Sequence, residues 1–361
     1  MQIFRVGITG DFLNTARASA YGDVGLSLLD ATPFIRYHFT EEHIPSLSDP
    51  TYYDRLYSLQ VTANHIADID GLVLLRPWVK AETFSRGADN LVVIGRSGAG
   101  YDKIDVAACT ANDVAVFNAP TALTHATAST ALMFMLALAK RLPAQERITR
   151  QGRWDLQPDV VGSELQGRTL GIVGLGASGR ELARLVAPFG LRIIAYSPKA
   201  DPAQAAALGV TLTSLDDLCR EADYISLHAS LTPERHKMIG ARHFALMKPS
   251  AYFINVARGA LVDQAALVRA LQEWRIAGAG LDVFEIEPVP VDDPLLKLDN
   301  VIVTPHWSPA TTDIWKATGK ATSTGMIRAA MGQIPENVIN PAVLDRPGFQ
   351  AKLARFAQNI V

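Results

Sequence analysis

Short apolar runs recur along the chain, and segments of mixed polarity separate them. Apolar runs of this kind, with few charges, are typical of strands that are buried on both faces of a parallel sheet. Several of the intervening segments place apolar residues at helical spacing. We predict strands over residues 3–9, 71–75, 91–94, 114–117, 170–173, 191–196, 224–228, 251–256, 278–283 and 301–303. The repeated alternation of strand and helix predicts an α/β fold built on doubly wound parallel sheets.

Two longer helices are predicted in addition. Residues 124–142 are rich in Ala, Leu and Met and are apolar on nearly every side, so this helix should lie buried between layers or at an interface. Residues 312–331 form a closing helix, and the tail that follows should pack back on the N-terminal part of the chain. Residues 118–121 are interpreted as a hinge. Residues 11–53 carry several Ser, Asp and Pro residues, and we make no detailed prediction for them.

Composition narrows the class of protein. A chain of 361 residues can form two domains, and 48% hydrophobic with 19% charged residues is ordinary for a globular enzyme. The formal net charge of −2 gives no reason to expect nucleic acid or an anionic membrane as a partner. The N-terminus shows no secretory signal, and the longest apolar run, residues 131–139, is too short to span a bilayer. We therefore expect a cytoplasmic protein without a membrane partner.

The cysteines and histidines indicate neither disulfides nor a metal. The chain contains only Cys109 and Cys219, which cannot provide a disulfide framework or a thiolate metal site. No cluster of His, Cys and Asp has the spacing of metal ligands, so no catalytic metal is predicted.

A glycine-rich motif follows the strand predicted over residues 170–173. The segment GLGASG (174–179), with a helix and a second strand after it, has the G-x-G-x-x-G arrangement of dinucleotide-binding units. Gly174 would make the tight turn, Gly176 would let the backbone approach a pyrophosphate, and Gly179 would let the helix pack closely on the strand. The helix N-terminus offers N–H groups and partial positive charge to phosphates. The alternative is an α/β unit with a glycine-rich turn and no ligand.

Two segments of the N-terminal part also follow predicted strands, where the ligand crevice of an open α/β sheet lies. Arg76 and Trp78 follow the strand over residues 71–75, and either could touch substrate, although a solvated Arg beside a packing Trp is the simpler interpretation. The loop GRSGAGYD (95–102) contains three glycines, which would bring backbone N–H groups close to a small anion. A plain tight turn is equally compatible with this loop.

Three polar side chains follow strands in the second half of the chain, namely Arg258, Glu287 and His306. Each alone has an ordinary explanation: a surface Arg, a solvated Glu or a capping His. Together at one nicotinamide crevice, they are what reduction of a 2-oxo acid requires. Arg holds a carboxylate and polarises the adjacent carbonyl, and His exchanges a proton near neutral pH. The carboxylate orients the imidazole and stabilises its protonated form, while the hydride is exchanged with the nicotinamide.

With these residues in place, the chain resembles the D-isomer-specific 2-hydroxyacid dehydrogenase family, which includes phosphoglycerate dehydrogenases and glyoxylate/hydroxypyruvate reductases. The matching segments, in family order, are RSGAGYDKID (96–105), LGIVGLGASG (170–179), ADYISLHASLTPE (222–234), MKPSAYFINVARGALVD (247–263), GLDVFEIEP (280–288) and VTPHWSPAT (303–311). The resemblance implies that Arg258 binds the substrate carboxylate and carbonyl and that Glu287 and His306 form the acid/base pair. It also implies that Asp282 holds the nicotinamide carboxamide.

The resemblance further implies two Rossmann-like domains. A substrate domain would comprise residues 1–118 and 312–361, and residues 119–311 would form a central dinucleotide-binding domain through which family members usually form homodimers. Backbone at Ala99 and Gly100 would hold the substrate carboxylate, with Arg76 as a further candidate. The residues expected to line the cofactor site are Gly174, Gly176, Ala177, Ser178, Gly179, Ser197, Lys199, His228, Ala229, Ser230, Ala257, Asp282 and Thr127.

The chain departs from the family pattern where the cofactor ribose would lie. NAD-specific members end the second Rossmann strand with an acidic residue that binds the ribose 2′-hydroxyl, whereas this chain has Ser197, followed by Pro198 and Lys199. A carboxylate would repel a 2′-phosphate, and a lysine would attract it. NADPH is therefore the favoured cofactor, and Asp201, slightly further on, keeps NAD open.

Other departures concern the substrate. Ser129 stands where the family commonly has Glu, Ser230 where it commonly has Pro, and Trp307-Ser308-Pro309 where a small residue usually follows the catalytic His. Trp307 would narrow or shape the pocket. For the two remaining histidines of interest, we expect backbone of His228 at the cofactor with a structural side chain, and His125 as a capping or interface residue.

Several alternative functions remain at this point. Phosphoglycerate oxidation is one, although no obvious basic cluster for a substrate phosphate is visible and no appended regulatory domain follows residue 361. Formate oxidation fits less well, because it needs no proton exchange and therefore no Glu–His pair. A dinucleotide-sensing, corepressor-like protein is the alternative from another class, and turnover would distinguish it.

Overall fold

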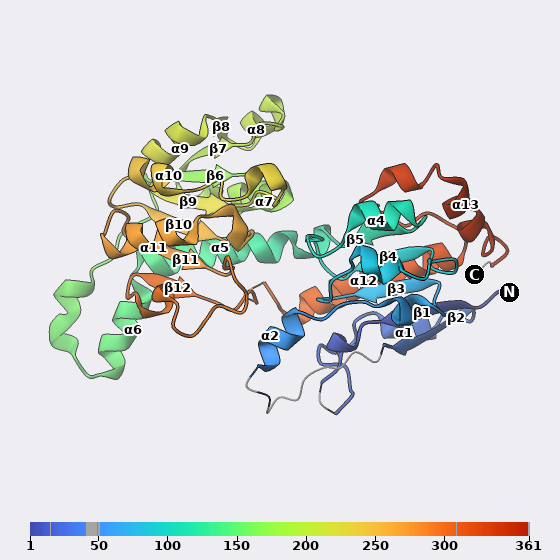
Figure 1. The fold of residues 1–361 in the computed structure, drawn as a ribbon. Helices are drawn as coiled ribbons and strands as arrows, with labels where there is room; N and C mark the ends of the chain where they lie inside the picture. The colour runs from blue at the N-terminus through green and yellow to red at the C-terminus, as the bar shows by residue number, and fades with distance from the viewer. Residues whose placement is uncertain (15, 41–48, 50, 308, 360–361) are drawn as a thin grey trace. The chain divides into compact units, whose positions relative to one another are not determined.

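The computed structural model describes residues 1–14, 16–40, 49, 51–307 and 309–359. The chain forms two compact units, Met1–Leu123 with Ala310–Val361 and Thr124–Pro309, which we call unit 1 and unit 2 (Figure 1). Unit 1 is thus built from both ends of the chain. The first crossing follows Leu123 rather than residue 118, because a 3-10 turn, Thr121–Leu123, continues unit 1 beyond its last strand. The return crossing lies between Pro309 and Ala310.

Unit 1 contains a five-stranded sheet in the order β2-β1-β3-β4-β5, with every neighbouring pair parallel. Its strands are β1 (Phe4–Ile8), β2 (Ile35–Phe39), β3 (Gly71–Leu74), β4 (Val93–Arg96) and β5 (Ala115–Asn118). Successive side chains of a strand point to opposite faces, so a strand that is apolar throughout needs cover on both sides.

Helices supply that cover on the two faces of the unit 1 sheet. One core joins the sheet to α1 (Leu26–Asp30), α12 (Thr312–Ala330) and α13 (Pro347–Ala354). The other joins it to α3 (Ala63–Ile66) and α4 (Val106–Ala111). A further helix, α2, spans Tyr52–Tyr57. The closing helix and the tail therefore pack on the N-terminal sheet.

Strand β2 falls in the region for which the sequence allowed no prediction. Of its five residues only Ile35 is buried, and the others alternate between half-buried and exposed. It pairs with β1 alone and lies at the sheet edge. An edge strand with so little buried surface has no long apolar run to reveal it.

Unit 2 contains a seven-stranded parallel sheet in the order β12-β11-β10-β9-β6-β7-β8. Its strands are β6 (Thr169–Val173), β7 (Arg192–Tyr196), β8 (Val210–Leu212), β9 (Tyr224–Leu227), β10 (Tyr252–Asn255), β11 (Gly278–Leu281) and β12 (Val301–Val303). The strand order reverses direction between β6 and β9. Ligands of open α/β sheets bind beyond the carboxyl ends of the strands at such a reversal. The short edge strand β8 was not predicted.

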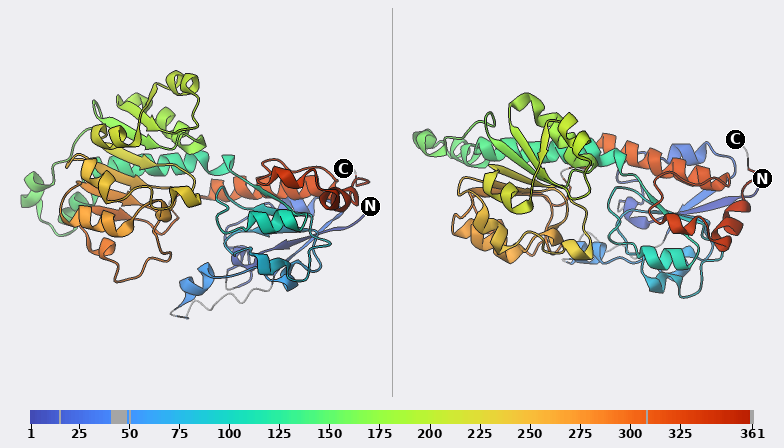
Figure 2. Two further views of the ribbon diagram at one scale, coloured as in Figure 1. Left: turned by 45° about the horizontal axis from the view of Figure 1, so that its top comes forward. Right: turned by 90° about the horizontal axis from the view of Figure 1, so that it is seen from above.

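Helices cover both faces of this sheet (Figure 2). One core includes side chains from α5 (Thr124–Ala139), α7 (Ala177–Val186) and α8 (Pro202–Ala207), and the other from α9 (Leu215–Glu221), α10 (Ala241–Leu246) and α11 (Gln264–Gln272). A further helix, α6, spans Leu142–Arg150. The doubly wound α/β fold predicted from the apolar pattern is thereby confirmed in both units.

Helix α5 is the apolar helix predicted over residues 124–142, and it ends earlier, at Ala139. By length and composition alone, the stretch Thr121–Ala139 would suffice to cross a membrane. The uninterrupted apolar run within this stretch, residues 131–139, is shorter. Phe134, Met135 and other side chains of α5 are buried in the core shared with the sheet and α7. This packing accounts for the apolar residues on the buried face of the helix.

Candidate active site

His306 and Glu287 form the central pair of the site. His306 follows β12 by three residues, and its Nδ1 lies 2.7 Å from Glu287 Oε2. The other carboxylate oxygen, Oε1, accepts a hydrogen bond of 3.0 Å from the Phe284 N–H. An ionised carboxylate only accepts, so Nδ1 carries the proton that faces Glu287. Nε2 is then the ring nitrogen that can exchange a proton with a substrate oxygen.

The environment of Glu287 keeps it ionised. Burial raises the pKa of this carboxyl, but the hydrogen bond and charge of His306, the Phe284 N–H and the charge of Arg258 together outweigh burial and lower it below its usual value. Glu287 is therefore a carboxylate at neutral pH, which is the form that can orient and stabilise an imidazolium.

Asp282 holds the segment that carries His306. Asp282 follows β11, is 1% exposed, and its Oδ1 accepts hydrogen bonds from Thr304 Oγ1 at 2.6 Å and from the Trp307 N–H at 3.0 Å. These two partners flank His306, whose backbone has a φ of 53°. The resemblance assigned Asp282 to the nicotinamide. Its role in holding the histidine segment was not predicted, because pairing across strand ends is a tertiary contact.

Arg258 is presented by a turn that Asn255 organises. Asn255 ends β10, is 1% exposed, and bonds to the turn with both ends of its amide. Its Oδ1 accepts from the Ala257 N–H at 3.0 Å, and its Nδ2 donates to the Arg258 carbonyl at 3.0 Å. Sequence reasoning missed Asn255. An amide at the end of an otherwise apolar strand was the signal available.

Gly259 brings the Arg258 turn against the segment that carries Glu287. A Cβ at this position would lie 1.9 Å from the Phe284 carbonyl carbon, so only glycine permits the contact. The charge of Arg258 is the smallest of the influences that lower the pKa of Glu287. The three side chains predicted to share one site thus come from neighbouring strand ends of unit 2.

The glycine motif forms a cradle at the N-terminus of α7. Gly174 has a φ of +98°, and a Cβ there would lie 2.6 Å from the Ala229 backbone nitrogen. A Cβ on Gly179 would lie 2.2 Å from the Gly174 oxygen. By contrast, nothing lies within 4 Å of a Cβ placed on Gly176. The described residues therefore pack tightly around Gly174 and Gly179 and leave the turn open at Gly176. The first N–H groups of a helix at such an opening attract phosphate.

This geometry and the comparisons with known proteins agree. A family profile described as "D-isomer specific 2-hydroxyacid dehydrogenase, NAD binding domain" matches residues 132–308. The glyoxylate reductase of Korarchaeum cryptofilum is 40% identical over 299 residues, which are 81% of this chain and 90% of that protein. The chain belongs to the D-isomer-specific 2-hydroxyacid dehydrogenase family. The predicted family, the oxidoreductase class and the use of a nicotinamide cofactor are thereby confirmed.

Two further relatives define the range of the similarity. The D-3-phosphoglycerate dehydrogenase of Methanocaldococcus jannaschii is 41% identical over 276 residues, which are 76% of this chain but only 52% of that protein. The crystal structure of the TT0316 protein from Thermus thermophilus superposes with a TM-score of 0.76 at 30% identity, covering 93% of this chain and 100% of that one. As a member of this family, the protein transfers hydride between a nicotinamide cofactor and 2-oxo or 2-hydroxy acids.

Several other residues that are predicted to contact the cofactor follow strands β7 and β9. Ser197, directly after β7, is half-buried, and Lys199 is exposed. Asp201 caps α8, where its Oδ1 accepts from the Ala203 N–H at 2.9 Å. His228 follows β9, and its ring contacts the hydroxyl groups of Ser226 and Ser178. Three more residues expected at the cofactor, Thr127, Ala229 and Ala257, are half-buried, and Ser230 is exposed.

Other predicted residues have partners of their own. The Arg76 side chain is 14% exposed and lies against Asp11 at 3.3 Å and the Tyr21 hydroxyl at 3.1 Å, so it is not the solvated Arg of the simpler interpretation. His125 Nδ1 pairs with Glu181 at 2.7 Å and links α5 to α7. A role of Arg76 toward substrate stays a prediction.

The predicted substrate loop lies in unit 1, after β4. Gly98 has a φ of +144°, and the Arg96 side chain folds over it to reach the Ser97 carbonyl. The carbonyl of Ala99 accepts from Asn118 Nδ2 at 2.6 Å. Ala99 and Gly100 are half-buried, and their role toward substrate remains a prediction. Of the residues around Trp307, Ser308 lies outside the described residues.

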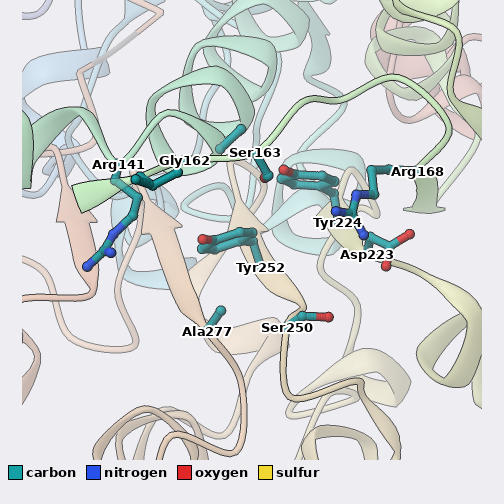
Figure 3. Close-up of a pocket in the computed structure, with 11 residues that line it drawn as sticks. Arg141, Gly162, Ser163, Arg168, Asp223, Tyr224, Ser250, Tyr252 and Ala277 are labelled. Carbon is teal, nitrogen blue, oxygen red and sulfur yellow. The ribbon is translucent and has the colours of Figure 1, made fainter. Parts of the chain in front are cut away.

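A cavity of about 220 Å³ lies at the opposite edge of the unit 2 sheet. Figure 3 shows the rings of Tyr224 and Tyr252, which begin β9 and β10, side by side in it, and their centroids are 5.5 Å apart. Arg141 and Arg168 also line it. Because these residues lie at or before the amino ends of the strands, the cavity lies away from the His306–Glu287 pair, which follows the carboxyl ends. Among the residues that the structure describes, no group of three or more His, Cys, Asp or Glu is placed to hold a metal ion.

Proposed function

We propose that this dehydrogenase reduces a small 2-oxo acid, of the class of glyoxylate and hydroxypyruvate, to its D-2-hydroxy acid with NADPH. The observation that carries the proposal is the His306–Glu287 contact of 2.7 Å, with the Arg258 turn packed alongside through Gly259. This arrangement combines a proton donor, His306, with a cationic side chain that can bind a carboxylate, Arg258. The similarity to glyoxylate reductases supports the choice of substrate class.

Each of the three side chains has a separate task in the proposed reaction. Arg258 binds the substrate carboxylate and polarises the adjacent carbonyl. His306 donates its Nε2 proton to the carbonyl oxygen, and Glu287 stays ionised and stabilises the imidazolium before transfer. The bound nicotinamide supplies the hydride that the carbonyl carbon accepts. The 2-oxo acid thus gains one hydride and one proton, and His306 is left neutral until it takes a proton from water.

The glycine cradle fits the cofactor that this chemistry needs. The open space over Gly176 and the N-terminus of α7 suit a pyrophosphate. Asp282, directly after β11, would hold the nicotinamide carboxamide. Thr127, Ala229, Ser230 and Ala257 would complete the lining.

The preference for NADPH rests on three residues after β7. Ser197 carries no charge, Lys199 is exposed, and Asp201 has one carboxylate oxygen engaged in capping α8. A carboxylate used as a cap is less available to a ribose 2′-hydroxyl. A 2′-phosphate would instead meet a lysine.

Replacement of this lysine tests the cofactor preference. Lys199→Ala should weaken NADPH binding about tenfold, since a hydrogen bond to a charged group is lost, and leave NADH binding unchanged. Lys316→Ala, an exposed lysine of unit 1, is the matched control. Equal Kd values for NADPH in both variants would contradict the preference.

The proposed reaction is tested by initial rates of NADPH and NADH oxidation with glyoxylate, hydroxypyruvate and pyruvate. Turnover of one of them with NADPH supports the proposal. The alternative is the phosphoglycerate dehydrogenase activity that is named for the Methanocaldococcus relative. Oxidation of D-3-phosphoglycerate in the reverse assay would support that alternative. Tight dinucleotide binding without turnover of any of these acids would overturn the proposed substrate class.

We also propose that the enzyme is a cytoplasmic homodimer formed through unit 2. Apolar side chains of this unit remain on its surface, including Met133 on α5 at 46% exposure, Trp154 at 63% and Val161 at 70%. Exposed apolar surface of this kind is typical of subunit interfaces.

A further inference from the structure

Three side chains form a line across the strand reversal of unit 2. Ser226 lies in β9 and is fully buried, His228 follows the same strand, and Ser178 is the second residue of α7. His228 Nε2 lies 3.0 Å from Ser226 Oγ, and Nδ1 lies 3.0 Å from Ser178 Oγ. The imidazole therefore connects a hydroxyl in the sheet interior to a hydroxyl in the glycine motif.

The charge state of His228 restricts how protons are arranged along this line. Burial lowers the pKa of His228 to about 4, so the ring is neutral at physiological pH. A neutral imidazole has one N–H donor and one acceptor nitrogen, and each hydroxyl has one proton. Only two consistent arrangements follow.

In the first arrangement, Ser226 donates to Nε2, and the Nδ1–H donates to Ser178 Oγ. The hydroxyl proton of Ser178 then remains available for another acceptor. In the second, Ser178 donates to Nδ1, and the Nε2–H donates to Ser226. The Ser178 oxygen then presents only lone pairs to its surroundings. The two arrangements differ in whether Ser178 attracts or repels an anion.

The position of Ser178 decides between them when the cofactor is bound. Ser178 is two residues after Gly176, over which the described structure is open, and it lies in the first turn of α7. This is where the pyrophosphate of a dinucleotide is expected. An anion there stabilises the arrangement in which a proton points toward it.

We propose that Ser226 and His228 form a hydrogen-bond relay that turns the Ser178 hydroxyl outward as a donor to the cofactor pyrophosphate. His228 and Ser226 are positioning residues in this relay, and only Ser178 touches the ligand. The inference rests on dinucleotide binding by this enzyme and is independent of the proposed 2-oxo acid. It assigns a function to the His228 side chain, for which the sequence predicted a structural role.

Measurements of ligand binding to the full-length protein test the relay without turnover. The Kd values of NADPH and ADP-ribose are measured by calorimetry for Ser178→Ala, Ser226→Ala and the double variant. ADP-ribose retains the pyrophosphate and lacks the nicotinamide, so both ligands should lose about tenfold in affinity with Ser178→Ala. Ser226→Ala should lose about threefold alone and nothing more in the Ser178→Ala background. Ser250→Ala, an exposed serine before β10, is the matched control.

Replacement of the histidine separates positioning from general damage. His228→Ala should weaken ADP-ribose binding, and His228→Asn should restore much of it, because the amide nitrogen can donate from near the place of Nδ1. A loss with His228→Ala that adds fully to that of Ser178→Ala would overturn the relay, as would wild-type affinity in Ser226→Ala.

The tautomer can be observed directly in the wild-type protein. Long-range ¹H–¹⁵N spectra of histidine-labelled protein, assigned with His228→Asn, distinguish an Nδ1–H from an Nε2–H imidazole. The relay requires the Nδ1–H form with ADP-ribose bound. An Nε2–H form in that complex would refute it, even if a serine variant failed to fold.

Discussion

His306 is held at its ring and on both sides of its backbone. Glu287 contacts the ring, while Asp282 binds Thr304 and Trp307, the residues on either side of the Pro305-His306 pair. A general acid is effective when its reacting nitrogen is kept in one place. The buried carboxylate of Asp282 therefore fixes the segment that carries the proposed general acid.

Removal of the imidazole should abolish most of the chemistry. His306→Ala is expected to lower kcat by about two to four orders of magnitude, the usual contribution of a general acid. NADPH affinity should stay within about twofold, because His306 acts on the substrate oxygen. Steady-state kinetics and a binding titration check both values. His236→Ala, an exposed histidine in the same unit, should behave as wild type. Full activity in His306→Ala would remove the catalytic assignment.

Glu287 should determine the pH range of reduction. Its lowered pKa keeps it ionised at neutral pH, so a negative charge faces the imidazole over the whole working range. Glu287→Gln removes that charge, and we expect the fall in reduction rate toward alkaline pH to begin at lower pH. The pH profile of kcat/KM for reduction measures the shift.

The wild-type pair also has a stability consequence with a defined sign. Because the folded pKa of Glu287 is lowered, its stabilisation is present above the unfolded-state pKa and is lost as pH falls through the folded pKa. Denaturant unfolding of Glu287→Gln and wild type should therefore converge in acid. If the unfolding free energy of Glu287→Gln had the same pH dependence as that of the wild type, the His306–Glu287 pairing would be contradicted.

At the scale of elements, the turn after β10 packs directly against the segment after β11. Asn255 holds the turn internally, and Gly259 lets it lie directly on Phe284. The contact is between backbones, so its closeness depends on the absence of a side chain at one position.

Gly259→Ala should therefore damage both stability and catalysis. The added Cβ meets backbone atoms at 1.9 Å, and overpacking of this kind costs about 1–3 kcal/mol of unfolding free energy. Because Arg258 would move away from Glu287, kcat/KM should fall as well. Gly240→Ala is the matched control, since its Cβ would meet no atom closer than 3.9 Å. Urea unfolding and initial rates of the two variants measure the difference, and equal values would refute the close-contact argument.

At the scale of the whole molecule, the surface of α5 bears on assembly. The buried face of this helix belongs to the unit 2 core, and Met133 lies on the exposed side. Met133→Glu should shift the proposed dimer toward monomer in sedimentation velocity, because burial of a charge in an apolar interface is costly. Met133→Leu, which keeps the surface apolar, should remain dimeric. A monomeric wild-type protein would contradict the dimer.

Much of the molecule could be predicted from local pattern. The central strands are apolar at nearly every position, so β6, β9 and β10 were found within a residue or two at each end. The edge strands β2 and β8 were not, because half-exposed positions give them no apolar run. Arg258, Glu287 and His306 were chosen because each follows a strand, and carboxyl ends of parallel strands lie at one edge of a sheet.

What the sequence determined by itself is the set of chemical groups and the alternation that brings strand ends together. The glycine motif and the three polar residues carry that information locally. Only the tertiary structure decided which groups hold them. Asp282 on the histidine segment, Asn255 beneath Arg258 and the Ser226–His228–Ser178 line all join residues through hydrogen bonds whose partners are set by packing. The spacing of apolar residues along a chain indicates whether a segment is a helix or a strand. The partner of a side-chain hydrogen bond depends instead on neighbours that folding brings together.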